Sequence, residues 1–448
     1  MVACFRISAG GTPFIAAGEK ERPEESVRSQ QQGFPCARST NEHEGGAMAD
    51  RVQAGRDDKS DIRITMTPGG PPENEIIIKS SVQLLYGERI RAVITDTLAR
   101  LGVRDTRVEA EDKGALDWVI MARVEAAAKR LYPMLSGEAL PDWACDPRPT
   151  VRFRLRRSRL YLPGSNPDLM LNAGLFKPDG VILDLEDSVA PTEKDTARLL
   201  VRNALRAIDF LGAERMVRIN QLPAGLEDLP AVVAQRVNMI LIPKVESAEQ
   251  ITQVANATQQ IAARLGVHDP IWLMPILESA AGVWHAYEIG AASEMVAALT
   301  FGAEDFTRDV QAERTVEGRE SFVARSLVVL GARASGVQPI DTVFSDVSDE
   351  AGLLSSTREA ISLGFEGKGC IHPRQIRVIH DAFRPKDEDI LYALKVKAAM
   401  EEAERTGSGV ISLGTKMIDP PVVARARRTL RVAEEMGIDI AAYAALGK

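Results

Sequence analysis

Short apolar runs, separated by stretches with helical periodicity, recur along the chain from about residue 159 onward. The runs are RLYLPG, DGVILDLED, RMVRIN, NMILIPK, IWLMPILE, VAALTFGAED, IDTVFSD and GKGCIHP. Strands that alternate with helices over about 220 residues are typical of a parallel (β/α)8 barrel, or TIM barrel. A doubly wound open sheet is the alternative, and it is less favoured because no glycine-rich nucleotide loop follows the first run. We therefore predict an α/β barrel over residues 153–384.

A smaller unit with a different pattern precedes the barrel, over residues 48–135. DIRITMTP and NEIIIKSSV indicate strands, whereas GERIRAVITDTLARLG and ALDWVIMARVEAAAKRLY carry apolar residues at helical spacing. Residues 136–152 are rich in proline and lack periodicity, which indicates a linker. Residues 1–47 are polar and cannot bury much apolar surface, so we predict a disordered tail and expect translation to begin at Met48.

A C-terminal extension follows the barrel, over residues 385–448. Pro385 and the acids after it mark the start of a helix in PKDEDILYALKVKAAMEEAERTGSG. GSGVISLGTKMIDPP is interpreted as a loop, and VVARARRTLRVAEEMG is predicted to be the last helix. The extension is therefore expected to be helical, with one long loop.

The charge and cysteine content of the chain exclude several classes of function. A formal net charge of −8 disfavours a nucleic-acid partner, which requires a concentrated basic patch. One basic cluster precedes the first barrel strand, and a solvated segment is favoured there over a phosphate-binding site; its members are Arg152, Arg154, Arg156, Arg157 and Arg159. The four cysteines show no metal-ligand spacing, which fits a reducing cytoplasm. No apolar run approaches the roughly 20 residues that a membrane span needs.

Polar side chains gather at the C-terminal ends of the predicted barrel strands. They include Asp184, Glu186, Asp187, Arg218, Asn220, Lys244, Glu246, Glu278, Glu304, Asp305 and His372. In a (β/α)8 barrel these ends meet on the face that carries the active site. Glu278 and Asp305 are the best candidate ligands for magnesium, which prefers hard oxygens, and no nearby His or Cys indicates zinc. Arg218 offers a planar fork for a substrate carboxylate, or a salt bridge to one of these acids, and both can hold at once.

Eight motifs between residues 157 and 437 resemble those of the citrate lyase beta subunit and its relatives, the malyl- and citramalyl-thioester lyases of the HpcH/HpaI aldolase superfamily. The motifs are RSRLYLPG, DGVILDLEDSVAP, VRIN, LIPKVES, PILESAAGV, FGAEDF, GFEGKGCIHPRQI and TKMIDPPVV. The resemblance implies that Glu278 and Asp305 bind Mg2+ and that Arg218 binds the substrate carboxylate. It also implies a catalytic carboxylate at Asp419, on a capping loop that in relatives packs over the barrel mouth of a neighbouring subunit within a trimer. Without the resemblance, Asp419 would be interpreted as a helix N-cap.

The N-terminal unit resembles the acyl carrier protein of citrate lyase, its gamma subunit. The likeness is carried by IKSSVQLLYGERIRAVITDTLARLGV and EDKGALDWVIMARVEAAAKR. Carriers of that kind hold a phosphoribosyl-dephospho-coenzyme A arm on a serine just before the first strand. In this sequence the best register puts Lys59 at that position, with Ser60 one step on. Either the attachment has shifted to Ser60, or the arm is absent and the unit is a structural relic.

The activity implied by these resemblances is a retro-Claisen cleavage of a citryl thioester to oxaloacetate and an acetyl thioester. Backbone N–H groups of Gly302, Ala303 and Glu304 are expected to help orient the substrate, and Glu186 to orient a water molecule at the metal. We expect a cytoplasmic homotrimer or larger oligomer that acts on a CoA-bound or carrier-bound acyl thioester, with a citrate lyase alpha (transferase) subunit as a possible partner. The alternatives are a stand-alone malyl-CoA or citramalyl-CoA lyase, and a non-catalytic scaffold or binding protein built on a decayed barrel.

Overall fold

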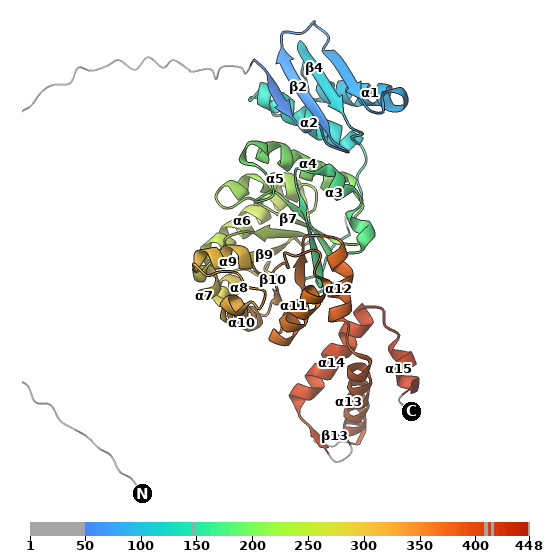
Figure 1. The fold of residues 1–448 in the computed structure, drawn as a ribbon, viewed down its shortest axis with the longest axis vertical. Coiled ribbons are helices and arrows are strands. Elements are labelled where there is room, and N and C mark those ends of the chain that lie inside the picture. Colours follow the sequence, from blue (N-terminus) through green and yellow to red (C-terminus); the bar gives the residue numbers. More distant parts are fainter. Residues whose placement is uncertain (1–49, 146–147, 407–410, 414–415, 447–448) are drawn as a thin grey trace, which may run out of the picture. The chain divides into compact units, whose positions relative to one another are not determined.

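A computed structural model describes residues 50–145, 148–406, 411–413 and 416–446 of the chain. The predicted disordered tail and Met48 lie outside these residues. Eight parallel strands form one sheet in the order β11-β10-β9-β8-β7-β6-β5-β12, and a bridge between Asp341 and Lys368 joins its two edges (Figure 1). The strands are β5 (Ser158–Pro163), β6 (Gly180–Asp184), β7 (Glu214–Arg218), β8 (Met239–Ile242), β9 (Trp272–Leu277), β10 (Ala298–Phe301), β11 (Gln338–Ile340) and β12 (Lys368–Cys370). The predicted (β/α)8 barrel is confirmed.

Both faces of the barrel sheet are buried, which explains why its strands are continuous apolar runs. In β8, Met239 and Leu241 join a cluster inside the barrel, whereas Ile240 and Ile242 pack outward in the core shared with the helices. The helices are α3 (Pro167–Leu171), α4 (Lys194–Ala207), α5 (Leu229–Val233), α6 (Ala248–Leu265), α7 (Ala280–Trp284), α8 (Ala286–Ala291), α9 (Ala303–Asp309), α10 (Arg319–Ala334), α11 (Glu350–Leu363) and α12 (Arg374–Phe383). None of the helices that the structure describes is long and apolar enough to cross a membrane.

The seventh barrel strand begins earlier than the run IDTVFSD predicts. Strand β11 covers Gln338–Ile340, and Asp341 already belongs to the bridge that closes the barrel. Asp341 is fully buried, and its carboxylate is held by Arg325 and Lys368. The predicted bounds were wrong because Gln338 and Pro339 are not typical strand residues. Proline is tolerated in β11 because this strand forms its ladder along its full length with β10 only.

The N-terminal domain is a four-stranded sheet with two helices. Its strands β1 (Val52–Ala54), β2 (Ile62–Pro68), β3 (Glu75–Ser80) and β4 (Thr106–Asp112) lie in the order β1-β2-β4-β3, with β3 and β4 parallel. In β2, alternate residues Ile62, Ile64 and Met66 are fully buried, as the period of a strand requires. The helices are α1 (Gln83–Leu101) and α2 (Asp117–Leu131), and both were predicted.

Helix α2 is buried on nearly every face, because it packs against its own sheet and against α4 of the barrel. Two ionised side chains of α2 lie in this interior and are paired. Arg123 forms an ion pair of 2.8 Å with Asp61 of its own domain, and Glu125 forms one of 2.6 Å with Arg202 of α4. All four side chains are at most 2% exposed. The small domain is therefore joined to the barrel through a buried, charged interface as well as through the linker.

The C-terminal extension contains helices α13 (Asp387–Thr406), α14 (Pro420–Glu435) and α15 (Ile440–Leu446). Helices α13 and α14 pack together through a small apolar cluster that includes Val396 and Leu430. The segment predicted to be a loop instead contains a two-stranded antiparallel hairpin, β13 (Ile411–Leu413) with β14 (Lys416–Ile418). Strands of three residues are too short to show a periodicity, so sequence pattern did not predict them.

Candidate active site

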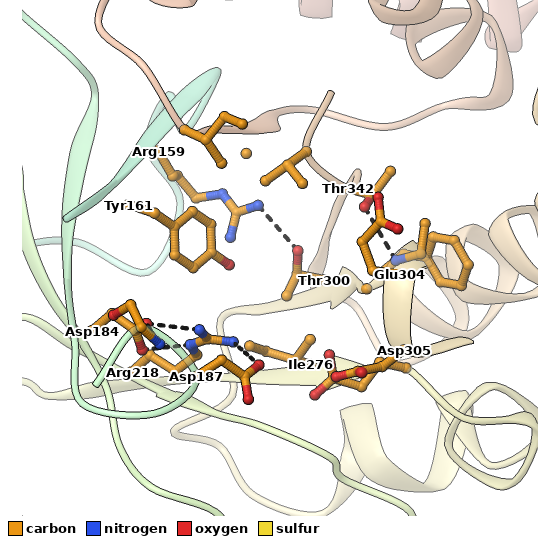
Figure 2. A pocket seen from close by; sticks show the side chains of 18 of the residues that line it. Arg159, Tyr161, Asp184, Asp187, Arg218, Ile276, Thr300, Glu304, Asp305 and Thr342 are labelled. Carbon is orange, nitrogen blue, oxygen red and sulfur yellow. Dashed lines mark hydrogen bonds and ion pairs between the residues drawn. The ribbon is translucent and has the colours of Figure 1, made fainter. Parts of the chain in front are cut away.

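A cavity of about 490 Å3 opens at the C-terminal ends of the barrel strands, where strand-end polar groups meet (Figure 2). Its lining includes Arg159, Tyr161, Asp184, Asp187, Arg218, Glu278, Thr300, Gly302, Ala303, Glu304, Asp305 and Asp341. Most of the predicted site residues are therefore brought together on one face. Glu186 and Lys244 do not line the cavity itself but contact residues that do.

Arg218, at the end of β7, is bound by acids at the end of β6 and in the loop that follows it. Its Nε and Nη2 donate to the two oxygens of Asp184 at 2.6 and 2.8 Å, and Nη1 lies 2.8 Å from Glu186. Burial alone would raise the pKa of Asp184, but the hydrogen bonds and charge of Arg218 lower it. The guanidinium also lies 5.6 Å from the ring centre of Tyr161. The salt bridge considered for Arg218 in the sequence analysis is present, and it fixes the orientation of the Arg218 guanidinium.

Lys244 is a strand-end residue to which the sequence analysis assigned no role, although it contacts three acids of the site. Its ammonium contacts the carboxylate of Glu186 and lies 3.9 Å from Asp305, while its backbone N–H donates to Glu278 Oε1 at 2.8 Å. Its φ of 52° is in the left-handed region, which a lysine adopts only at some cost. The strained backbone directs the N–H toward one acid and leaves the side chain free to reach two others. Despite burial, Glu186 raises the pKa of Lys244.

Glu278, at the end of β9, is a buried carboxylate with no cationic side chain in ion-pair contact among the described residues. Burial raises its pKa to about 8, and the charges of Asp305 and Glu186 add to the rise although the Lys244 N–H opposes it. Gly302 allows the close approach of the next loop, because a Cβ at that position would lie 2.6 Å from Glu278 Oε2. The sequence places glycine where the carboxylate needs room.

Two of the three backbone amides predicted to orient substrate already donate within the protein. The N–H of Gly302 donates to Leu277 O at 3.0 Å, and that of Ala303 donates to Thr342 Oγ1 at 3.2 Å. The predicted role does not suit these two groups, because each has a partner that a substrate would have to displace. The N–H of Glu304 lies in the first turn of α9, where the helix itself offers no acceptor. Asp305, in the same turn, forms an ion pair of 2.8 Å with Arg308.

Asp419 and Ser60 lie outside the cavity of this chain. Asp419 is the exposed residue before α14, and its side chain makes no capping hydrogen bond there. Ser60 donates from Oγ to Asp168 Oδ1 at 2.9 Å, and the Lys59 ammonium lies 3.1 Å from the same carboxylate. Asp168 belongs to α3, which follows β5 at the cavity end of the barrel. The predicted attachment region therefore lies against the barrel, on the side where the cavity opens.

The basic cluster before the first barrel strand is not a solvated segment throughout. Arg156 is fully buried and pairs with Glu214, and Arg157 pairs with Asp179. Arg159 is also buried, but it lies inside the barrel and lines the cavity. The prediction was wrong because it treated the cluster as one unit, whereas β5 begins at Ser158 and turns alternate residues inward.

Comparisons with known proteins place the barrel in a family. Residues 157–373 match the family described as HpcH/HpaI aldolase/citrate lyase. The citrate lyase subunit beta of Haemophilus influenzae is 40% identical over 285 residues, which cover 63% of this chain and 98% of that protein. The chain belongs to the HpcH/HpaI aldolase/citrate lyase family. It is thus a lyase of the type that includes citrate lyase beta and the citramalyl-CoA and malyl-CoA lyases.

Other members of the HpcH/HpaI family cover similar parts of the chain. The mitochondrial citramalyl-CoA lyase of Homo sapiens is 34% identical over 320 residues, 69% of this chain and 94% of that protein. A structure of CitE from Mycobacterium tuberculosis in complex with magnesium, acetoacetate and coenzyme A has 30% sequence identity and a TM-score of 0.52. It covers 63% of this chain and 100% of the CitE chain. Residues 49–131 match a second family, described as malonate decarboxylase delta subunit (MdcD), which supports the carrier-like assignment of the N-terminal domain.

Proposed function

We propose that this chain is a magnesium-dependent carbon–carbon lyase that cleaves a citryl thioester to oxaloacetate and an acetyl thioester. The observation that carries the proposal is a pair of acids beside Arg218 in one cavity. Glu278 follows β9, and Asp305 lies in the first turn of α9, after the adjacent strand β10. The two carboxylates suit a hard cation such as magnesium, and the fixed arginine suits a substrate carboxylate. The substrate's own carboxylate and hydroxyl oxygens would complete the coordination of the cation.

The residues present fit magnesium. Glu278 is buried without a cationic side chain in contact and lies near enough to Asp305 for their charges to interact, so a cation would relieve the repulsion between them. No group of three or more His, Cys, Asp or Glu side chains with ligand geometry occurs among the described residues. Magnesium usually takes one or two protein carboxylates and fills its other positions with water and substrate. When bound by Glu278 and Asp305, it supplies Lewis-acid polarisation of the substrate's hydroxyl oxygen.

The reaction breaks the bond between the hydroxyl-bearing carbon and the carbon next to the thioester. A base removes the hydroxyl proton, the C–O bond becomes a carbonyl, and the bonding electron pair leaves on the thioester as an enolate that takes up a proton. Arg218 holds the carboxylate beside the hydroxyl, since Asp184 fixes its orientation. Asp419 of a neighbouring subunit is the proposed proton-transfer group. Glu186, held by Arg218 and Lys244, would position the polar groups around a cation bound by Glu278 and Asp305.

The N-terminal domain is proposed to carry the acyl group. Ser60 lies against α3, and a phosphoribosyl-dephospho-CoA arm attached there would start beside the cavity of its own barrel. Attachment of the substrate to the same chain would raise its local concentration without new contacts. The carrier role implies a transferase partner such as a citrate lyase alpha subunit. The proposal also includes a homotrimer, in which Asp419 serves a neighbouring barrel, and a cytoplasmic setting, in which the free thiols Cys145 and Cys370 stay reduced.

A second candidate is a lyase that acts on free citramalyl-CoA or malyl-CoA. It is favoured by the contacts of the attachment region, because Ser60 already donates its hydroxyl to Asp168 and Lys59 stands at the expected serine position. A non-catalytic scaffold is disfavoured by the convergence of Arg218, Glu278 and Asp305.

One assay separates these functions. The purified full chain is mixed with magnesium and citryl-CoA, citramalyl-CoA or malyl-CoA, and release of the α-keto acid is measured with and without a chelator. The proposal requires oxaloacetate release from citryl-CoA that the chelator stops and added magnesium restores. Release of pyruvate or glyoxylate alone would favour the second candidate, and no release from any substrate would leave the scaffold.

A further inference from the structure

Arg159 is a buried cation inside the barrel, at the cavity. It lies on β5 two residues before Tyr161, so both side chains point to the barrel interior. Figure 2 shows its guanidinium directed toward Thr300, on the far side of Tyr161 from Arg218. Its exposed fraction is 1%, so it is enclosed by protein apart from the cavity it lines.

The contacts of Arg159 are all with neutral groups. Nη1 lies 3.0 Å from the sulfur of Met274, and Nη2 donates to Thr300 Oγ1 at 3.1 Å and to the backbone oxygen of Asp341 at 3.3 Å. Nε has no hydrogen-bond partner. The nearby carboxylate of Asp341 is occupied by Arg325 and Lys368. No described carboxylate is therefore available to neutralise Arg159.

This lack of a counter-ion distinguishes Arg159 from four other buried arginines of the chain. Each of the following is paired with a buried carboxylate: Arg123, Arg156, Arg202 and Arg325. An isolated buried charge is costly, because the interior does not replace the hydration it loses. A guanidinium that faces a cavity in this state is suited to an anion that arrives with a ligand.

We propose that Arg159 binds a second carboxylate of the substrate and so selects a dicarboxylic hydroxyacyl thioester. The inference rests on the proposed function. A citryl thioester has two free carboxylates, one beside the hydroxyl and one on the adjoining methylene, whereas citramalyl and malyl thioesters have only the first. Arg218 takes the first carboxylate, and Arg159 takes the second. Thr300 fixes the guanidinium through its hydroxyl, and Asp341 does so through its backbone oxygen.

The residues around the two arginines support this division of roles. Arg218 already donates N–H groups to Asp184 and Asp187 and forms an ion pair with Glu186, so its capacity for a second substrate carboxylate is limited. Arg159 has no carboxylate partner among the described residues, and its Nε is buried without a hydrogen-bond partner. A substrate with a methyl group or hydrogen in place of the carboxymethyl group that bears the second carboxylate would leave Arg159 buried and unpaired, which disfavours its binding.

The test compares selectivity between substrates in wild type and Arg159→Met. The methionine fills similar space beside Met274 but carries no charge. The ratio of kcat/KM for citryl-CoA to that for citramalyl-CoA should fall about 10- to 100-fold, because a charge-assisted contact is lost for one substrate alone. Arg159→Lys should recover part of the ratio. Arg154→Met is the matched control, because it removes the same charge from the same cluster outside this cavity, and it should leave the ratio unchanged.

A binding measurement keeps the inference separate from the activity. Calorimetry with magnesium present compares oxaloacetate, which has two carboxylates, with pyruvate, which has one. Arg159→Met should weaken oxaloacetate binding at least about tenfold more than pyruvate binding. An equal change for both ligands, or an unchanged citryl-CoA to citramalyl-CoA ratio, would overturn the role of Arg159. If wild type binds oxaloacetate selectively through Arg159 but cleaves no thioester, the proposed function fails and the anion subsite stands.

Discussion

Lys244 connects the acids of the site through two different groups of one residue. Its backbone N–H holds Glu278, and its ammonium holds Glu186 and approaches Asp305. Three carboxylates from different loops are thereby kept at fixed positions before any ligand arrives. The left-handed backbone of Lys244 is consistent with local strain retained at a functional site.

The two proposed ligands can be tested by removing one charge at a time. Glu278→Gln and Asp305→Asn should each reduce magnesium-dependent cleavage at least about 100-fold, since neither amide is a good ligand for magnesium. Circular dichroism should show an unchanged fold. The matched control is Glu246→Gln, an exposed strand-end acid outside the cavity, which should keep wild-type activity. Full activity of either ligand variant, or of wild type in excess chelator, would exclude the assignment.

At the scale of single residues, the sequence indicated which acids would meet but not how they are held. Glu278, Asp305 and Arg218 were predictable, because the ends of parallel barrel strands share one face. The contacts of Lys244 depend on a backbone angle that no pattern encodes. Arg159 lacks a carboxylate partner because the folded chain brings only neutral groups to it. The sequence does not show this, so Arg159 could not be distinguished from the other arginines of its cluster.

Among the elements, helix α2 shows how tertiary packing changes the meaning of a sequence pattern. Its charged residues suggest a helix with a solvated face, yet Arg123 and Glu125 are buried. The helix was predicted correctly from its periodicity, but the partner that covers its second face lies in another domain. The hairpin β13–β14 was missed for a simpler reason, since three residues are too few to establish a period.

The buried pair between α2 and α4 should contribute strongly to stability. Arg202→Met leaves Glu125 buried and ionised next to Lys129 alone, and Glu125→Gln leaves Arg202 without its carboxylate. Each variant should lower the free energy of unfolding by about 3 kcal/mol, as measured by urea denaturation. Glu402→Gln, which breaks an exposed pair with Arg405, should give no measurable change. Equal stability of all three variants and wild type would show that this interface does not hold the domains.

The same pair predicts a dependence of stability on pH. Burial alone would raise the pKa of Glu125, but Arg202 and then Lys129 outweigh it, so its pKa lies below the ordinary value. A carboxyl with a lowered folded-state pKa contributes stability above its unfolded pKa, and the contribution is lost as pH falls through the folded value. The stability advantage of wild type over Glu125→Gln should therefore be full at pH 6 and shrink below about pH 4. An advantage that is constant from pH 6 to pH 3 would contradict this origin.

For the whole molecule, the proposed proton-transfer group and the cavity lie in different places within one chain. Asp419 is exposed at the start of α14 and does not line the cavity. An arrangement in which each extension serves a neighbouring barrel would bring them together, and a capping loop would also exclude water from the enolate.

Mixed oligomers test this arrangement. Asp419→Asn and Arg218→Ala should each be nearly inactive alone. After the two are refolded together, random assortment should place a native barrel beside a native loop at about a quarter of the sites, and activity should return to that extent. Mixtures that stay inactive despite proven subunit exchange would show that Asp419 serves its own barrel or has no role.

The mass of the full chain from its native host tests the carrier proposal. A prosthetic arm should appear as an added mass on the N-terminal domain, and Ser60→Ala should remove it. Activity on free thioesters should survive in this variant, because Ser60 does not line the cavity. An unmodified native chain that cleaves free CoA thioesters would favour the second candidate function.

The N-terminal domain and the barrel are expected to coevolve at their shared interface. Because Glu125 and Arg202 are fully enclosed, a substitution at one changes which residues are tolerated at the other, although the two belong to different domains. The amide of Asn203 on α4 also donates to the backbone of Trp118 on α2. A lineage that came to encode the two domains as separate chains would have to rebuild the outer face of α4 for water. An engineer who wants the barrel alone faces the same redesign, starting with Arg202 and Asn203.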